Sequence, residues 1–179
     1  MVIAMRHTRA SPGIGPTTRV SAMRIILVLS LVALVAVAPI HSGETPEALA
    51  LSRLKQHNAR LAWSPNPIKV DIDCDGKQDY VFLAQDAESA SVGVVLGRNT
   101  TSITVRRFGV SSSDQDELCA VPATIAPEPL DYDPTDAVGK LPGFARSKQC
   151  TAFVLSDGQC DPFHFFWNKK TGRLDWWRL

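Results

Sequence analysis

The chain lacks the patterns of several common protein classes. It has no CxxC pair, so its four cysteines do not have the spacing of a zinc site. The serines at 111–113 are accompanied by no GxSxG, HExxH or SxxK motif, so the sequence supports no catalytic residue. Its 19 basic and 18 acidic side chains leave a net charge of +1, which does not favour a nucleic-acid partner.

Acidic residues are also missing from the first 42 positions, which contain four arginines. All 18 acids lie in residues 43–179, which therefore carry a net charge of −3. Residues 25–40 form an apolar run in which Ser30 has the only polar side chain. Arg24 precedes this run and small or polar residues follow it, which is the pattern of a secretory signal peptide. We therefore expect residues 1–42 to be an N-terminal extension and signal segment.

A second start at Met23 would give a signal peptide of normal length, and we expect cleavage after Ser42. The alternative is an uncleaved anchor, but a helix over this apolar run spans only about 24 Å, which is short for a bilayer core. No cysteine closely follows the run, which argues against a lipid anchor. The sequence thus predicts a periplasmic or secreted protein that meets the membrane only through this segment, with residues 43–179 as one exported domain.

Export also determines how the cysteines are interpreted. They are Cys74, Cys119, Cys150 and Cys160. An even number in an oxidising compartment predicts two disulfide bonds, for which three pairings are possible. A hairpin turned at residues 156–159 would separate Cys150 from Cys160 by about 16 Å, beyond disulfide reach. We therefore expect the pairs Cys119–Cys150 and Cys74–Cys160.

The pattern of residues 43–179 predicts a mainly β domain with one N-terminal helix. Thr45 and Pro46 form a helix start, and leucines then recur at three- and four-residue steps until Pro65 ends the pattern. Residues 111–148 hold five prolines and seven acids, which predicts one long loop. Six or seven short, mostly antiparallel strands are expected at 68–72, 80–85, 91–96, 102–108, 150–155, 163–167 and 173–177.

One segment has the spacing of a calcium loop. In Asp71-Ile-Asp-Cys-Asp-Gly-Lys-Gln-Asp79, carboxylates occupy positions 1, 3, 5 and 9, and a glycine at position 6 permits the turn. Hard cations take six to eight oxygens at about 2.4 Å, and alternate side chains of a tight loop can supply them. The predicted ligands are the side chains of Asp71, Asp73, Asp75 and Asp79 and the carbonyl of Lys77. The alternative interpretation is a solvated acidic turn.

This loop is not an EF-hand, because the position of the bidentate glutamate is Phe82 and a strand follows. It resembles the DxDxDGxxD loops of integrin-type and propeller-type repeats, which are FG-GAP-like. The resemblance implies a structural Ca²⁺ that fastens the connection between two strands.

Aromatic residues gather at the C-terminus, in a predicted hairpin over residues 163–177. Alternation places Phe163 and Phe165 on one face, and His164 and Phe166 on the other, so both faces are partly apolar. One face is expected in the core. The second is either covered by the helix and the long loop, which we favour, or exposed to a partner. His164, the only histidine in an expected strand, is interpreted as a packed side chain.

A small exported β domain with one calcium loop and an acidic loop resembles bacterial periplasmic lysozyme inhibitors and the immunity proteins of Xanthomonas-like bacteria. The resemblance implies a protein partner of the peptidoglycan-hydrolase class, into whose cleft a loop inserts. In this chain that loop would be 111–148, with Asp131, Tyr132 and Asp133 at its centre. The alternatives are a purely structural calcium-binding envelope protein and a small secreted hydrolase that uses His164 or Asp133.

Overall fold

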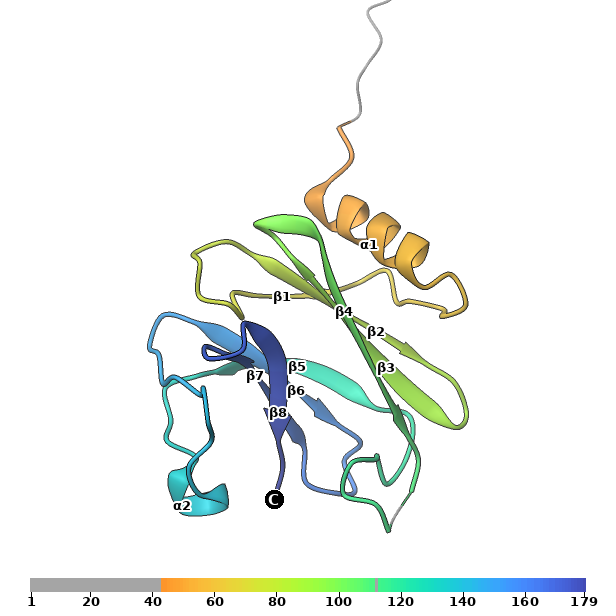
Figure 1. The fold of residues 1–179 in the computed structure, drawn as a ribbon. Helices are drawn as coiled ribbons and strands as arrows, with labels where there is room; N and C mark the ends of the chain where they lie inside the picture. Colours follow the sequence, from red (N-terminus) through yellow and green to blue (C-terminus); the bar gives the residue numbers. More distant parts are fainter. Residues whose placement is uncertain (1–42, 112) are drawn as a thin grey trace, which may run out of the picture. The chain divides into compact units, whose positions relative to one another are not determined.

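The computed structural model describes residues 43–111 and 113–179, so the expected signal segment lies outside the described part. Within this part the chain forms eight strands in two four-stranded antiparallel sheets, together with two helices (Figure 1). The predicted mainly β class is confirmed. The described part contains no helix that is long and apolar enough to span a membrane.

The two sheets follow one another along the chain without crossovers. The first has the order β1 (Ile68–Val70), β2 (Asp79–Gln85), β3 (Ser89–Leu96) and β4 (Asn99–Gly109). The second has the order β5 (Thr124–Pro129), β6 (Thr151–Ser156), β7 (Phe163–Asn168) and β8 (Arg173–Trp177). All seven sequence-predicted strands are present, with ends that differ by up to three residues.

The main hydrophobic core lies between the sheets. Phe108 of β4 packs against Phe163 of β7 with ring centroids 4.6 Å apart, and Phe153 of β6 stacks on Phe165 of β7 at 4.4 Å. All four rings are essentially inaccessible to solvent. Burying a side chain of this size contributes about 2–3 kcal/mol, and the Phe108–Phe163 pair joins the two sheets, whereas Phe153 and Phe165 are neighbours within the second sheet.

Helix α1 (Pro46–His57) covers the other face of the first sheet (Figure 1). Its predicted start is confirmed, because the Thr45 hydroxyl accepts a hydrogen bond from the Ala48 N–H and Pro46 occupies the first turn. Leu54 packs into a second apolar cluster on this face. The helix approaches so closely that a Cβ at Gly93 would overlap the Leu54 side chain. Since β3 is covered on both faces, all eight of its residues are buried.

The prediction of one long ordered loop over 111–148 holds only in part. The segment contains strand β5 and the short helix α2 (Thr135–Val138). Strand β5 carries Pro127 and Pro129, which made it read as a loop. These prolines are tolerated because β5 is an edge strand that pairs only with β6.

The C-terminal hairpin has one face in the main core, as expected. Its second face is covered by the segment that follows β5: Phe144 lies 5.3 Å from Phe166, and Tyr132 lies 6.2 Å from Trp177, measured between ring centroids. Coverage by the long loop is therefore confirmed, whereas helix α1 packs on the other sheet and takes no part in it.

Both disulfide bonds form, but the expected pairing is wrong. The bonds are Cys74–Cys150 and Cys119–Cys160, with Cα–Cα distances of 5.2 and 5.9 Å. The hairpin after β6 has a longer loop than predicted, so Leu155 faces Phe163 and not Cys160. A bridge between Asp71 and Thr151 brings Cys74 to the start of β6. Two disulfide bonds fit a protein from an oxidising, extracytoplasmic compartment.

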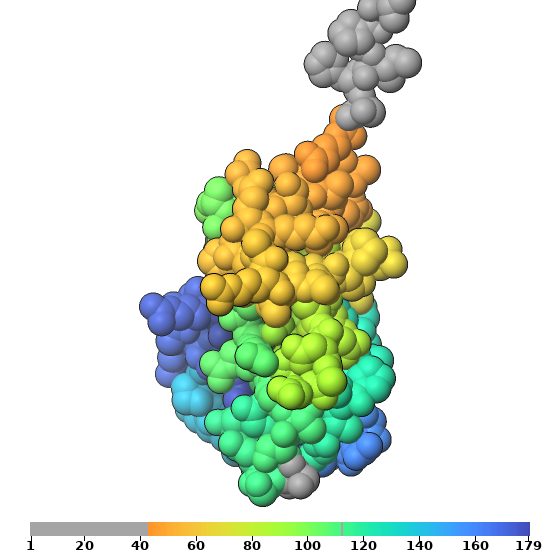
Figure 2. Space-filling view, turned by 90° about the vertical axis from the view of Figure 1, so that its right-hand side faces the viewer, coloured from red at the N-terminus to blue at the C-terminus, as the bar shows by residue number. Residues whose placement is uncertain are grey.

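The outer surface on the side of α1 is formed by several segments, with residues of the first sheet between its two ends. Figure 2 shows residues 43–66 as a continuous surface at one end of this face, while residues 113–125 lie at the opposite end. Glu47 and Lys69 form an ion pair that ties α1 to β1.

Candidate metal centre

The aspartate-rich loop connects β1 to β2 and is shaped by its own side chains. The Asp71 carboxylate accepts hydrogen bonds from the backbone N–H groups of Asp75 and Gly76, each at 3.0 Å. Two residues have positive φ, Cys74 at 60° and Gly76 at 81°. Glycine adopts this backbone conformation without strain, which explains its place at the turn.

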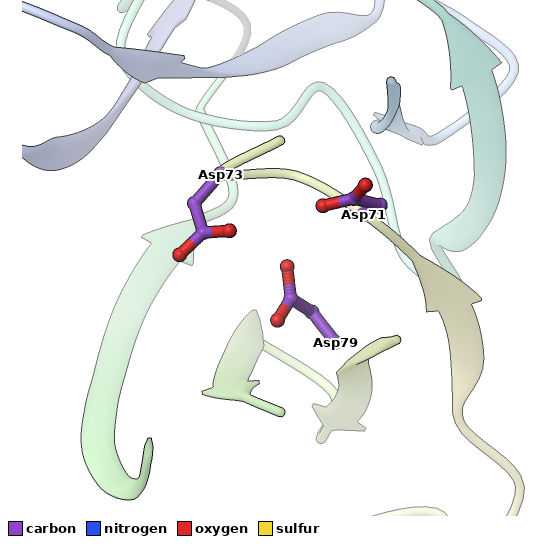
Figure 3. A group of neighbouring side chains, drawn as sticks. All are labelled: Asp71, Asp73 and Asp79. Atoms are coloured by element: carbon purple, nitrogen blue, oxygen red, sulfur yellow. The ribbon is translucent and has the colours of Figure 1, made fainter. Parts of the chain in front are cut away.

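Three aspartates converge on one point (Figure 3). One carboxylate oxygen from each of Asp71, Asp73 and Asp79 lies within 4.8 Å of the other two. Two ligands on opposite sides of a calcium ion, each at about 2.4 Å, are themselves about 4.8 Å apart. The three oxygens can therefore belong to one coordination sphere, and oxygen is the donor that hard cations prefer.

Asp79 is the most constrained member of this cluster. Its side chain is fully buried, and its two oxygens accept hydrogen bonds from the N–H groups of Ile72 (2.9 Å) and Gly97 (2.8 Å). Burial raises the pKa of Asp79 to about 6, against the lowering effect of these two hydrogen bonds. A buried carboxylate of this kind is stabilised in its charged form by a nearby cation.

Asp73 faces a positive side chain from the β3–β4 turn. The Arg98 Nε lies 2.9 Å from Asp73 Oδ2, but the contact is misaligned, so this buried oxygen receives no hydrogen bond. Burial raises the pKa of Asp73, and the nearby charge of Asp75 raises it further. The Asp73 backbone carbonyl accepts a hydrogen bond from Lys169 Nζ at 2.7 Å. The loop is thus joined to both sheets.

The remaining predicted ligands, Asp75 and Lys77, lie on the exposed side of the loop. Asp75 Oδ1 accepts a hydrogen bond from the Lys77 N–H at 2.9 Å, and Asp75 is not part of the convergent trio. The structure therefore brings together three of the four predicted carboxylates. Together with a buried oxygen that lacks a hydrogen-bond donor, the donor set fits a hard cation.

Three functional neighbours of the cluster were not found from the sequence. They are Gly97, Arg98 and Lys169, which come from the turns after β3 and β7. Gly97 approaches the loop so closely that a Cβ would overlap the Gln78 carbonyl oxygen. No local motif marks these residues, because they meet the loop only through the folding of the two sheets.

The predicted partner-binding residues lie in the segment that covers the second sheet. Asp131 is exposed and pairs with Arg146 at 2.8 Å, and the exposed Asp133 accepts a hydrogen bond from the Thr135 N–H at 3.0 Å. Tyr132 is different, because its ring packs between Phe144 and Trp177. The three residues are therefore adjacent in the chain but face different surroundings.

Tyr132 also belongs to a polar network with His164. The Tyr132 hydroxyl donates to Glu128 Oε2 at 3.3 Å, and Glu128 Oε1 lies 2.7 Å from His164 Nδ1. Burial raises the pKa of Tyr132 to about 12, and the negative charge of Glu128 raises it further. His164 stacks on Trp177 with ring centroids 4.1 Å apart. Within the described residues no nucleophilic side chain contacts this histidine, which fits its interpretation as a packed residue.

Comparison with known proteins returned no matching family model, curated protein or solved structure. The functional assignment therefore rests on the residues and geometry described above.

Proposed function

We propose that the protein is an exported calcium-binding protein in which Ca²⁺ is a structural ion. One observation carries this proposal: three aspartate oxygens lie within one coordination sphere, and the side chains of Asp73 and Asp79 are buried there. Three carboxylates at this distance repel one another unless a cation is present. The nearby Arg98 supplies only one positive charge, and half of its side chain is exposed.

Calcium at this position would fasten several elements at once. The loop contacts the β3–β4 turn through Asp79 and Asp73, the β7–β8 turn through Lys169, and the start of β6 through the Cys74–Cys150 bond. Extracellular sites of this class bind Ca²⁺ at about 0.1–1 mM, so the ion would be a permanent part of the exported protein and not a signal.

The test of this proposal is isothermal titration of the purified protein with calcium, together with thermal unfolding in calcium and in a chelator. Binding with a raised melting temperature is expected. An unchanged melting temperature and no heat of binding would falsify the calcium assignment.

We further propose that this calcium-stabilised domain, located in the periplasm or secreted, inhibits a cell-wall hydrolase. The support is the acidic start of the segment that follows β5, because residues 131–136 contain three aspartates and no basic residue. Its Asp131 is held by Arg146 and its Tyr132 by packing, so Asp133 is presented on an ordered surface. A preordered loop loses little conformational entropy on binding, and an acidic one attracts the basic surface of a lysozyme-like enzyme.

A direct inhibition assay tests this second step. Lysis of peptidoglycan by a basic lysozyme is measured with and without an equimolar amount of the protein. Asp133→Asn removes the charge but keeps an acceptor for the Thr135 N–H, so weaker inhibition is expected. Glu88→Gln, at an exposed acid in the β2–β3 turn, is the matched control and should leave inhibition unchanged. If the protein binds calcium but inhibits none of the hydrolases tested, the structural role of calcium stands and the inhibitor function is rejected.

A further inference from the structure

The two sheets end in free edges that border the same groove. Among the described residues, β4 pairs only with β3 and β8 pairs only with β7. A groove of about 410 Å³ lies between these two edges, with residues 104–106 of β4 on one side and residues 174–176 of β8 on the other. The sandwich is therefore open along this flank.

The floor of the groove is apolar. Phe165, which lines it, is completely buried in the main core, and Leu174 and Trp176 are only partly covered. A side chain entering between the sheets would contact Leu174 and Trp176, which lie over Phe165. Apolar surface of this kind favours burial by about 25 cal/mol for each Å² that is removed from water.

The central part of strand β4 lacks the features that usually protect an edge, although its pairing with β3 shifts register between Val95 and Leu96 and its last residue, Gly109, accepts a hydrogen bond from the Leu118 N–H. The strand is eleven residues long and contains no proline, and its centre is rich in β-branched residues. Exposed edges normally carry prolines, bulges or inward-pointing charges that prevent pairing with another chain. Only the arginines near its end interrupt this edge.

The charge along this edge has one sign. Residues 89–113 contain three arginines and no acid, although the exported domain as a whole is acidic. Arg106 lines the groove, is exposed, and makes no ion pair with any described residue. The one acid in the groove, Asp175, already accepts hydrogen bonds from Asn168 and from the Trp176 N–H. Arg106 is therefore available to a negative ligand.

We propose that this groove binds an extended acidic segment of another protein, which adds to the free edge of β4 as a further strand. The backbone of the segment would pair with β4, and its apolar side chains would contact Leu174 and Trp176. Arg106 and Arg107 project to opposite faces of β4, so acidic side chains on either face of the added strand would meet a guanidinium. A second copy of this chain fits less well, because two β4 strands would bring like charges together.

The binding test uses two synthetic peptides of nine residues, one repeating Glu-Glu-Val-Val and the other repeating Lys-Lys-Val-Val, so that each face of the bound strand carries both charged and apolar side chains. Each is titrated into the isotopically labelled protein, and amide shifts and amide exchange are followed by NMR. The acidic peptide is expected to shift and protect amides of β4 and to move the indole signal of Trp176. The basic peptide is expected to bind at least about threefold more weakly.

Two charge-reversal variants connect the effect to the groove. Arg106→Glu should weaken binding of the acidic peptide at least about threefold, since attraction becomes repulsion at an exposed position. Arg60→Glu makes the same charge change on an exposed residue of the α1–β1 connection and should leave the affinity unchanged. Equal binding of both peptides, equal effects of both variants, protection elsewhere in the protein, or self-association through β4 in sedimentation would each overturn the proposal.

Discussion

The guanidinium of Arg98 lies 2.9 Å from the carboxylate of Asp73, within the cluster that could hold a cation. The Arg98 side chain therefore occupies a place next to the proposed calcium and contributes a charge of the same sign. Because half of this side chain is exposed, it can turn away from the cluster without leaving a buried charge unpaired. The strength of calcium binding should depend on this competition.

Replacing Arg98 with glutamine should strengthen calcium binding. Loss of the guanidinium removes a positive charge beside the ion and frees Asp73 Oδ2, so we expect the dissociation constant to fall about three- to tenfold. Isothermal titration calorimetry at fixed ionic strength measures it. Arg60→Gln, at an exposed arginine outside the cluster, should bind as the wild type does. Unchanged or weaker binding in Arg98→Gln would contradict the competition.

The buried and exposed aspartates of the loop should differ in importance. Asp79→Asn removes a charge from the centre of the cluster and should abolish the calcium-dependent rise in melting temperature. Asp75→Asn changes an exposed residue outside the trio and should retain most of it. A wild-type protein at a calcium concentration 100 times its dissociation constant gains about 2.7 kcal/mol. Differential scanning calorimetry with calcium and with chelator compares the variants, and equal losses would argue against the geometry described here.

The two disulfide bonds should affect calcium binding differently. They close loops with separations of 76 and 41 residues, so removal of either should cost roughly 4 kcal/mol of stability through the entropy of the unfolded chain. Only Cys74 lies within the calcium loop. Replacing Cys74 and Cys150 with alanine should therefore also weaken calcium binding, whereas replacing Cys119 and Cys160 should not. Titration of both folded variants at low temperature measures this, and the second variant is the control for general destabilisation.

Asp157 should make the protein sensitive to acid. Burial opposes its ionisation, but hydrogen bonds from the N–H groups of Cys160, Gln159, Cys119 and Ala120 together lower the pKa of Asp157. The pKa of Asp157 is lower in the folded protein than in the unfolded chain, where an aspartate has a pKa of about 3.9. The ionised carboxylate therefore stabilises the fold above this pH, and this contribution is lost as the pH falls below it.

Urea unfolding between pH 6.5 and pH 3 tests this dependence. The difference in midpoint between wild type and Asp157→Asn should be largest at pH 6.5 and should shrink towards pH 3. Asp161→Asn, at an exposed aspartate with no side-chain hydrogen bond in the structure, should run parallel to the wild type over this range. A difference that is constant with pH would mean that the charge of Asp157 is not responsible.

Much of the fold could be predicted because its signals are local. The Thr45 cap and the alternating strands depend on neighbouring residues, and the structure contains each of these elements. Strand β5 was missed because its prolines are typical of loops, and only its position at the edge of the second sheet makes them acceptable.

The candidate site could be predicted only in part, because only some of its signals are local in the sequence. The spacing of the aspartates identified the loop, but their burial depends on contacts made from other strands. Arg98 and Lys169 reach the loop across the fold, and no sequence pattern relates them to it. The exclusion of a Cys150–Cys160 bond agrees with the structure, but the choice between the two remaining pairings was wrong because it depends on the bridge between Asp71 and Thr151, which are far apart in the chain.

The close approach of Gly97 to the aspartate-rich loop offers a means of finding relatives of this protein. A side chain at this position would collide with the backbone of Gln78, and the Gly97 N–H is needed by Asp79, eighteen residues earlier. Distant homologues that keep the loop should therefore keep a glycine at this spacing after its last aspartate, even where strands and surface have diverged. The aspartate spacing together with this glycine forms a search pattern that is more selective than the aspartates alone.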